Sequence, residues 1–314
     1  NLLNIQVAEV TRMSTGLDEF DRVLGGGFVE GSVTLLGGEP GIGKSTLALH
    51  CADALSVADS VLYATGEESL QQLALRAART KIDGSNIQII ATSELESVLH
   101  VAELTNPNLV VIDSIQTLFS TEHESASGSM AQVRACSDRL MRFAKSTGTA
   151  ILMIGHITKD GALAGPKLLE HIVDTVLYFE GDADSRLRLV RATKNRFGAV
   201  NEVGVFVMTD SGLRGVENPS SMLLSSENRD KTGSVVLVAQ EGTRPLLVEL
   251  QALVDESVLT APRRLSIGLD GGRINMLLAV LHRHVGISLS NWDVYVNVAG
   301  GIKLTETATD VAIV

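Results

Sequence analysis

Short runs of hydrophobic, often β-branched residues alternate along the chain with longer stretches whose hydrophobic positions recur every three or four residues. The first pattern is typical of buried strands and the second of helices that cover a sheet. Strands are predicted at 33–36, 61–64, 87–90, 109–112, 150–154 and 173–179. Helices are predicted between them, at 46–54, 69–80, 94–104 and 130–146. This alternation predicts an α/β fold with a mostly parallel central sheet.

The pattern changes after the sixth strand. Two further runs, 187–193 and 203–208, predict a hairpin added at the edge of the sheet. Polar residues then dominate from 217 to 233, which indicates a linker. A new α/β pattern follows, with strands at 235–239, 246–252 and 294–298 and a helix at 275–284. We therefore predict two domains, residues 1–230 and residues 231–314.

One loop between a predicted strand and a predicted helix carries a phosphate-binding motif. Residues 38–45 fit the pattern G-x-x-x-x-G-K-[ST]. Its glycines let backbone N–H groups face a polyphosphate at a helix N-terminus. Lys44 supplies a positive charge for the β- and γ-phosphates, and Ser45 supplies a hydroxyl for Mg²⁺. The predicted nucleotide-binding residues, for ATP or ADP, are Gly38, Glu39, Pro40, Gly41, Ile42, Gly43, Lys44, Ser45 and Thr46.

Carboxylates follow two of the other predicted strands. Asp113 ends the strand 109–112, where it could support Mg²⁺ together with Ser45. Glu67 and Glu68 follow the strand 61–64, and one of them could act as the general base for an attacking water. The sequence does not choose between the two glutamates. Either could instead only favour the positive end of the next helix dipole.

Two cations stand one residue apart near the end of the predicted hairpin strand. Lys194 and Arg196 would point the same way on an extended segment, because strand side chains alternate. Such a pair could reach the nucleotide of a neighbouring subunit as a finger acting in trans. From the pattern alone, a solvated basic turn is the better interpretation.

Composition narrows the choice of function. The 314 residues are 45% hydrophobic, enough for a large core, and their formal net charge of −11 shows no global basic field. Cys51 and Cys136 lie in helical runs, which favours core thiols in a reducing compartment. No apolar run approaches the roughly 20 residues that span a bilayer. The first residues lack the basic region of a signal peptide, so we expect a cytoplasmic protein without a membrane partner.

Five motifs, in this order, give the sequence a closer resemblance: GGEPGIGKST, ATGEES, VVIDSIQT, GHITKDGALAGPKLLEH and KNRFG. They resemble the RadA (Sms) family of bacterial DNA-repair proteins, whose members join a RecA-like hexameric ATPase to a Lon-protease-like domain. The resemblance therefore implies a RecA-like P-loop domain followed by a partial Lon-like α/β domain. The family also has a four-cysteine zinc module, which these residues do not contain, so no zinc is expected in them.

The resemblance also implies roles for individual residues. Glu67 and Glu68 match the family's catalytic acidic pair, and Asp113 its metal-supporting aspartate. His156 matches a position that senses the γ-phosphate in RecA-like folds, and Lys194 and Arg196 would be the fingers acting in trans. DNA contacts would come from loops at 120–130 and 158–166. The candidate DNA-binding residues are Lys159, Lys167 and Arg134.

The function implied is an ATP-dependent DNA motor of homologous recombination and repair. Its partners would be single-stranded and branched DNA, further copies of the chain in a hexamer, the recombinase RecA and a replicative helicase. A RecA-type strand-exchange recombinase and a KaiC-like regulatory ATPase are the alternatives. A Lon-type protease is not expected, because residues 305–310 offer no serine nucleophile and no glycine pair.

Overall fold

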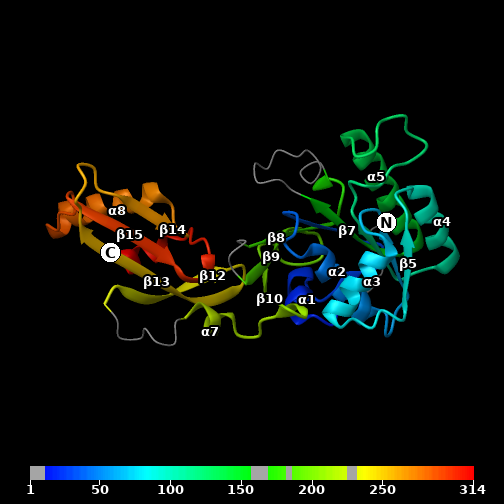
Figure 1. Cartoon of the computed structure of the whole chain (residues 1–314), viewed down its shortest axis with the longest axis horizontal. Helices are drawn as coiled ribbons and strands as arrows, with labels where there is room; N and C mark the ends of the chain where they lie inside the picture. Colours follow the sequence, from blue (N-terminus) through cyan, green and yellow to red (C-terminus); the bar gives the residue numbers. More distant parts are fainter. Residues whose placement is uncertain (1–10, 157–168, 182–185, 225–231) are drawn as a thin grey trace, which may run out of the picture. The chain divides into compact units, whose positions relative to one another are not determined.

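The structure is a computed structural model that describes residues 11–156, 169–181, 186–224 and 232–314. The chain divides into two compact units, one ending at Val216 and the other beginning at Glu217 (Figure 1). The sequence predicted the boundary at residue 230. The difference arises because α7 (Pro219–Leu223) lies within the polar stretch and packs against strand β13 (Arg244–Glu256) of the second unit.

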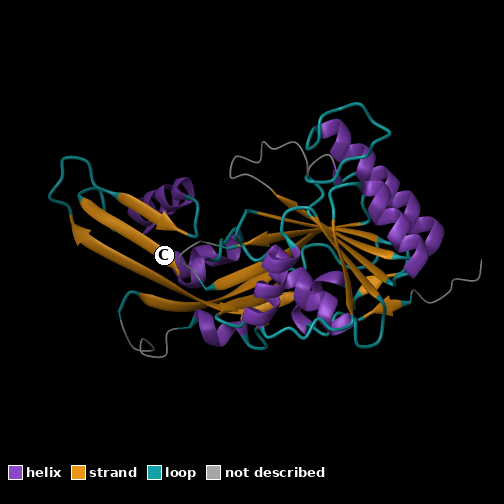
Figure 2. Cartoon of the chain, turned by 45° about the vertical axis from the view of Figure 1, so that its right-hand side comes forward, coloured by secondary structure: helices purple, strands orange, loops and turns teal. Residues whose placement is uncertain are grey.

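A twisted sheet forms the centre of the N-terminal unit (Figure 2). Within the described residues it has nine strands in the order β11-β10-β9-β8-β3-β7-β6-β4-β5, and β3 to β8 are parallel. The parallel strands are β3 (Val33–Gly38), β4 (Val61–Thr65), β5 (Ile87–Ala91), β6 (Leu109–Asp113), β7 (Ala150–His156) and β8 (Thr175–Glu180). The antiparallel strands are β9 (Leu187–Asn195), β10 (Val203–Thr209) and β11 (Gly212–Gly215).

Helices cover both faces of this sheet. One face packs against α1 (Asp18–Leu24), α2 (Lys44–Leu55) and α3 (Leu70–Thr80). The other packs against α4 (Leu95–Thr105) and α5 (Met130–Thr147). The central strands are hydrophobic on both faces because both are buried, which is what the continuous apolar runs predicted. Both cysteines are buried and free, on α2 and α5.

Local sequence signals explain where several helices begin. Ser69 and Gln72 form a reciprocal capping box at the start of α3, and Ser129 accepts the Gln132 N–H at the start of α5. The predicted strands, helices and edge hairpin of this unit are confirmed to within two residues at each end. The sequence did not predict α1, β11 or the small pair β1 (Arg12–Met13) and β2 (Phe28–Val29), all of them short.

The C-terminal unit is built on a smaller sheet. Within the described residues it has four strands, in the order β12 (Ser234–Glu241), β13, β15 (Trp292–Val298) and β14 (Arg264–Ile267). One face buries alternate residues of β13 and β15 beneath α8 (Gly271–Val280) and the short helices around α9 (Asp310–Ile313). The predicted helix at 275–284 begins earlier, at Gly271, and its last turn is a π-helix, Leu281–Val285.

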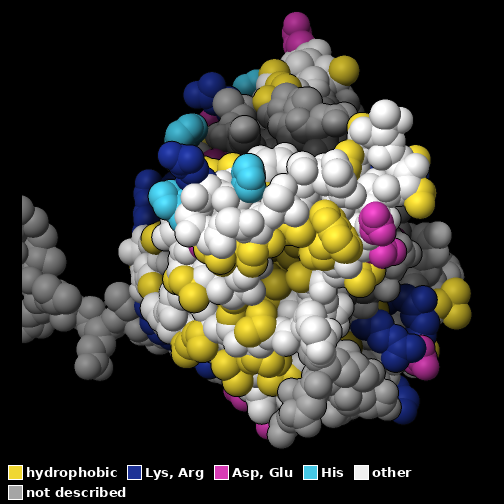
Figure 3. All heavy atoms as spheres, turned by 90° about the vertical axis from the view of Figure 1, so that its left-hand side faces the viewer, with side chains coloured by type: hydrophobic (Ala, Val, Ile, Leu, Met, Phe, Trp, Pro, Cys, Tyr) yellow, Lys and Arg dark blue, Asp and Glu magenta, His cyan; other side chains and the backbone are white. Residues whose placement is uncertain are grey.

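The opposite face of the C-terminal sheet remains open. Figure 3 shows hydrophobic side chains gathered around a hollow on the side of the molecule that it presents. A pocket of about 210 Å³ on the open face is lined by residues of β13, β14 and β15, including Leu253, Leu265, Ile267 and Tyr295.

No described helix is both long enough and apolar enough to cross a membrane.

Candidate nucleotide site

The phosphate-binding loop connects the carboxyl end of β3 to the first turn of α2. Gly41 and Gly43 adopt positive φ angles of 77° and 119°, which let the loop turn tightly into the helix. Gly38 also needs its missing side chain, because a Cβ there would lie 2.8 Å from the Phe179 carbonyl oxygen. The loop therefore has the backbone shape of a cradle for phosphate groups at a helix N-terminus.

Lys44 lies inside this loop and is only 3% exposed. Its Nζ donates to the carbonyl oxygens of Gly38 and Glu39, at 2.9 and 2.8 Å. Burial lowers the pKa of Lys44 to about 8, and the negative charges of Glu67 and Asp113 oppose that shift. The lysine is thus held within the loop, next to carboxylates that partly balance its charge.

His156 joins this lysine to one of the two candidate glutamates. The residue ends β7, the neighbour of β3, so its ring reaches the loop. Nδ1 lies 3.1 Å from Lys44 Nζ, and Nε2 lies 2.9 Å from Glu67 Oε1. The Ser114 hydroxyl also donates to Glu67 Oε1. The hydrogen bond from His156 is the main cause that lowers the pKa of Glu67, so this carboxyl is held in its ionised form.

Glu68 points to different partners from those of Glu67. Its carboxylate pairs with Arg76 on α3, where Arg76 Nε lies 3.1 Å from Glu68 Oε2 and Nη2 contacts Oε1. Arg76 Nη1 also donates to the Thr46 hydroxyl at 3.2 Å. The two adjacent glutamates therefore bond to different groups. Glu67 belongs to the group around Lys44, and Glu68 ties the glutamate turn to the first turn of α2.

Asp113 ends β6 and is 2% exposed. The Tyr63 hydroxyl donates to its Oδ2 at 2.7 Å, while Oδ1 is buried without a hydrogen-bond partner among the described residues. Burial raises the pKa of Asp113, and hydrogen bonds from the Tyr63 and Ser45 hydroxyls oppose that shift. A buried oxygen without a partner, beside a serine hydroxyl, suits the ligand shell of Mg²⁺.

Lys194 and Arg196 lie at the amino ends of the parallel strands, which we call the amino edge, whereas the phosphate-binding loop lies at their carboxyl ends, the carboxyl edge. β8 runs parallel to β3, with Phe179 opposite Gly38, and β9 runs antiparallel to β8, with Asn195 opposite Thr175. The end of β9 is therefore beside the beginning of β8, at the edge away from the phosphate-binding loop. The intervening length is that of the strand, roughly 16 Å for six residues. Lys194 and Arg196 are thus separated from the loop of their own chain.

The turn 194–198 divides structural and exposed roles among its residues. Asn195 Nδ2 donates to the carbonyl oxygens of Val23 and Leu24, and its Oδ1 accepts the Phe197 N–H at 2.9 Å. A Cβ on Gly198 would lie 2.9 Å from Asn195 Nδ2, so glycine leaves room for that side chain. The side chain of Arg196, by contrast, is 56% exposed. The asparagine and the glycine build the turn, and the arginine extends from it.

The predicted DNA-binding residues are only partly described. Lys159 and Lys167 lie outside the described residues. Arg134 lies on α5, where its side chain is 64% exposed and pairs with Asp138 at 3.9 Å. The loop at 120–130 is fixed by Gln132, whose Nε2 donates to the carbonyl oxygens of three loop residues, Ser120, His123 and Ser125. These hydrogen bonds could not be predicted from the sequence, because a glutamine on a helix is usually solvated.

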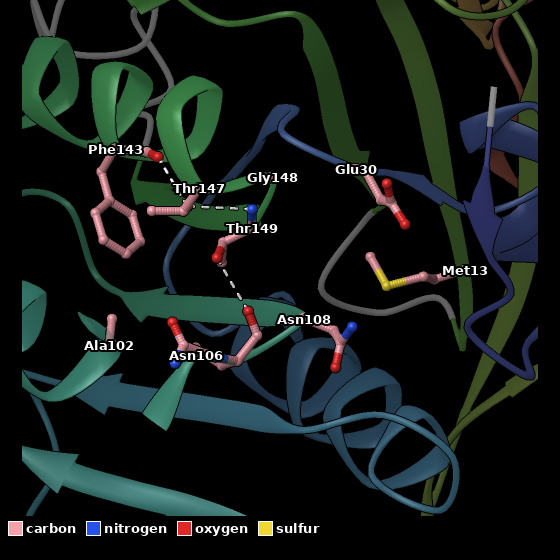
Figure 4. A pocket seen from close by; sticks show the side chains of 10 residues that line it. Met13, Glu30, Ala102, Asn106, Asn108, Phe143, Thr147, Gly148 and Thr149 are labelled. Atoms are coloured by element: carbon pink, nitrogen blue, oxygen red, sulfur yellow. Dashed lines mark hydrogen bonds between the residues drawn. The ribbon is translucent and has the colours of Figure 1, made fainter. Parts of the chain in front are cut away.

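A pocket of about 230 Å³ lies at the amino ends of β6 and β7, apart from the phosphate-binding loop (Figure 4). Two of its threonine hydroxyls are already bonded within the chain. Thr149 Oγ1 donates to the Pro107 carbonyl oxygen at 3.0 Å, and Thr147 Oγ1 donates to that of Phe143 at 2.8 Å. The candidate chemistry of this unit is therefore at the carboxyl edge and the turn 194–198, and we assign none to this pocket.

Comparison with known proteins identifies the family. Residues 5–162 match the protein family described as an AAA domain. The DNA repair protein RadA of Pseudomonas aeruginosa is 54% identical over 312 residues, which cover 99% of this chain and 69% of that protein. The chain belongs to the RadA family of DNA repair proteins. The resemblance drawn from the five motifs is thereby confirmed.

Solved structures confirm the predicted RecA-like fold. The RadB recombinase is 25% identical with a TM-score of 0.52, and the match covers 65% of this chain and all of that chain. A KaiC-like protein from Pyrococcus horikoshii OT3 is 22% identical with a TM-score of 0.55, covering 66% of this chain and all of the other. Together with the family, this fold establishes a RecA-like P-loop ATPase.

Proposed function

We propose that the chain is an ATP-driven DNA motor of homologous recombination and repair. It binds single-stranded DNA within a hexameric ring and drives branch migration of recombination intermediates. The observation that carries this proposal is the separation of two groups on one sheet. The hydrolytic group lies at the carboxyl edge, and the cations Lys194 and Arg196 lie at the opposite edge, near the amino end of β8.

Hydrolysis would use Glu67 as the general base. Its lowered pKa keeps the carboxylate ready to take a proton from the water that attacks the terminal phosphate of ATP. Lys44 supplies positive charge to the phosphates, and His156 holds Lys44 and Glu67 in one hydrogen-bonded row. Glu68 keeps a positioning role through Arg76. The different partners of Glu67 and Glu68 thus support Glu67 as the base, a choice that the sequence alone does not make.

The metal-binding residues in this proposal are Ser45 and Asp113. The buried Oδ1 of Asp113 fits a place in the ligand shell, directly or through water. Mg²⁺ neutralises charge on the β- and γ-phosphates when it is bound. Tyr63 fixes the direction of the Asp113 carboxylate by donating to its other oxygen. Gly38, Glu39, Pro40, Gly41, Ile42, Gly43, Lys44, Ser45 and Thr46 would surround the phosphates.

Lys194 and Arg196 would complete the site of a neighbouring subunit. A cation that cannot reach its own phosphate-binding loop can stabilise transition-state charge only on a nucleotide held by another copy. The exposed side chain of Arg196 suits this role. A closed ring of six copies gives each loop one such neighbour.

One candidate DNA-binding segment directly follows a residue of the nucleotide site in the sequence. His156 is the last residue of β7, and the segment that carries Lys159 and Lys167 begins directly after it. A change in the hydrogen bonds of His156 on hydrolysis would thus be transmitted to these cations. Cations in a glycine-rich segment contact phosphates without reading bases, so we expect binding of any sequence.

The C-terminal unit would be a Lon-like domain without protease activity, with the RecA-like domain preceding it. Thr309 is 1% exposed, and its hydroxyl donates to the Glu306 carbonyl oxygen at 2.6 Å. Arg273 binds the neighbouring Asp310 at 2.6 Å and fixes this short helical segment. The Thr309 hydroxyl is therefore bonded to the backbone of its own turn, and a hydroxyl used in this way is poorly placed as a nucleophile.

The proposal is tested by ATP hydrolysis rates with single-stranded DNA, with duplex DNA and without DNA, alongside the oligomeric mass. We expect stimulation by single strands of several unrelated sequences and a mass of six chains. Lys44→Ala should abolish the stimulated rate. A rate that no DNA changes would support a regulatory ATPase instead, and open filaments that exchange strands would support a recombinase.

A further inference from the structure

Asp174 is the one residue that contacts both the backbone and the side chain of Arg196 among the described residues. Its carbonyl oxygen accepts the Arg196 N–H at 3.2 Å. Its carboxylate Oδ1 accepts Arg196 Nη1 at 3.1 Å. Asp174 therefore holds the arginine at two points, its backbone N–H and its guanidinium group.

The carboxylate of Asp174 is itself fixed in the fold. Its side chain is 1% exposed, directly before β8. Oδ2 accepts the Val33 N–H at the start of β3, at 3.1 Å, and Lys145 Nζ on α5, at 3.0 Å. An anchor bonded to a central strand and to a helix cannot move without disturbing both. Arg196 is therefore attached to the rigid part of the unit.

The same segment also holds the other cation. Lys194 Nζ donates to the carbonyl oxygens of Glu170 and Val173, at 2.5 and 2.7 Å, and Val173 immediately precedes Asp174. Burial lowers the pKa of Lys194, and the nearby charge of Arg196 acts in the same direction. In the isolated chain Lys194 thus donates to backbone oxygens and would have to leave them to act in trans, whereas Arg196 keeps more than half of its side chain in solvent.

An arginine can be held by one of its nitrogens and still bind another molecule with the rest. Its planar guanidinium carries five N–H donors, and the Asp174 carboxylate takes only one nitrogen, Nη1. The remaining donors of the exposed fork stay available to another molecule. A cation that is already oriented loses less entropy when it meets a phosphate.

We propose that Asp174 is a positioning residue that orients Arg196 toward the nucleotide of a neighbouring subunit. This inference rests on the proposed role of Arg196 in trans. Asp174 does not touch the nucleotide of either chain; it acts through the arginine. Without its negative charge, Lys145 and Arg196 would remain as two cations near each other with no carboxylate between them, and the arginine would turn away.

Asp174→Asn is the first test, because the carboxamide oxygen can still accept the Val33 N–H. We expect kcat for ATP to fall by on the order of 10²-fold, while KM and nucleotide affinity stay unchanged. Lys145→Gln is the matched control, since it removes the other ion pair of the same carboxylate and should keep most of the turnover. Wild-type kcat in Asp174→Asn would overturn the inference.

Mixed oligomers separate a positioning role from a merely structural one. Lys44→Ala subunits have a defective loop but an intact arginine. Mixing them with Asp174→Asn subunits should restore activity, because an intact loop then meets an oriented Arg196. Mixing Asp174→Asn with Arg196→Ala should restore none, since both lack a working finger. If Asp174→Asn does not fold, Asp174→Ser replaces it in the same mixtures.

Two failures of the mixing experiment have different meanings. If Arg196→Ala is rescued by Lys44→Ala and the Asp174 variants are not, the inference on Asp174 is wrong and the finger in trans stands. If neither is rescued at any ratio, the proposed action of Arg196 in trans is wrong, and the inference falls with it.

Discussion

In the described part of the N-terminal unit, the side chains of Lys44, His156 and Glu67 bond to one another at the carboxyl ends of the parallel strands. At the amino edge, Arg196 and Lys145 share the buried carboxylate of Asp174 and remain 56% and 49% exposed. The members of the first group bond to partners within the chain. The second presents cations to the surroundings. This difference suggests that one edge holds the nucleotide and the other serves the nucleotide of a neighbouring copy.

The two groups also differ in the elements that position them. The nucleotide group lies on the ends of adjacent parallel strands, where side chains from β3, β4, β6 and β7 converge. Arg196 follows the last residue of β9 and depends on a turn. Its turn is held by Asn195 and Asp174 rather than by strand pairing alone.

The largest expected effect is that of Arg196→Ala on turnover. A finger in trans is worth on the order of 10³–10⁵ in rate in well-studied P-loop enzymes. We expect this loss in kcat with unchanged nucleotide affinity, because the loop of the same chain is intact. Steady-state kinetics and a nucleotide-binding titration measure the two quantities. A parallel loss of affinity would place Arg196 at its own loop and break the comparison of the edges.

Glu67→Gln should have the next largest effect. Removing the general base should lower kcat by about 10²–10⁴-fold. Glu68→Gln is the matched control, because it makes the same chemical change one residue away and should have a much smaller effect on kcat. Rapid-quench measurement of the hydrolysis step distinguishes chemistry from product release. The reverse order of the two variants would exchange the roles of the glutamates.

Asn195→Ala tests by its effect on stability whether Asn195 has a structural role in the turn that carries Arg196. The substitution leaves the Phe197 N–H without its side-chain acceptor and should lower the free energy of unfolding by about 1–3 kcal/mol. Urea denaturation measures this change, with Arg196→Ala as the control that should unfold close to wild type. Equal destabilisation by both would mean that the arginine is also structural.

The smallest effect concerns the pH profile at the carboxyl edge. The hydrogen bond from His156 lowers the pKa of Glu67, so His156→Ala should raise that pKa again. The base must be ionised to accept a proton, so the acid limb of kcat should move to higher pH. The pH–rate profile of His156→Ala, with Glu68→Gln as the unshifted control, measures this. An unmoved acid limb would exclude Glu67 as the titrating base.

The motifs predicted the nucleotide group because their residues are tied to strand ends. Lys44, Asp113 and His156 each follow or end an apolar run, and parallel strands bring their carboxyl ends together. The partners Arg76 and Tyr63 could not be predicted, since one is a solvated-looking residue on a helix and the other lies within a strand. No local sequence pattern around Asp174 predicts its contact with Arg196.

The sequence by itself determined the α/β alternation, the phosphate-binding loop and the family, because these depend on local periodicity and on motifs of fixed spacing. Only the tertiary structure separated Glu67 from Glu68 and placed Arg196 at the far edge from Lys44. Both depend on which strands lie side by side and in which direction they run. Pairing between distant segments is decided by the packing of the whole sheet, and no short stretch of sequence contains it.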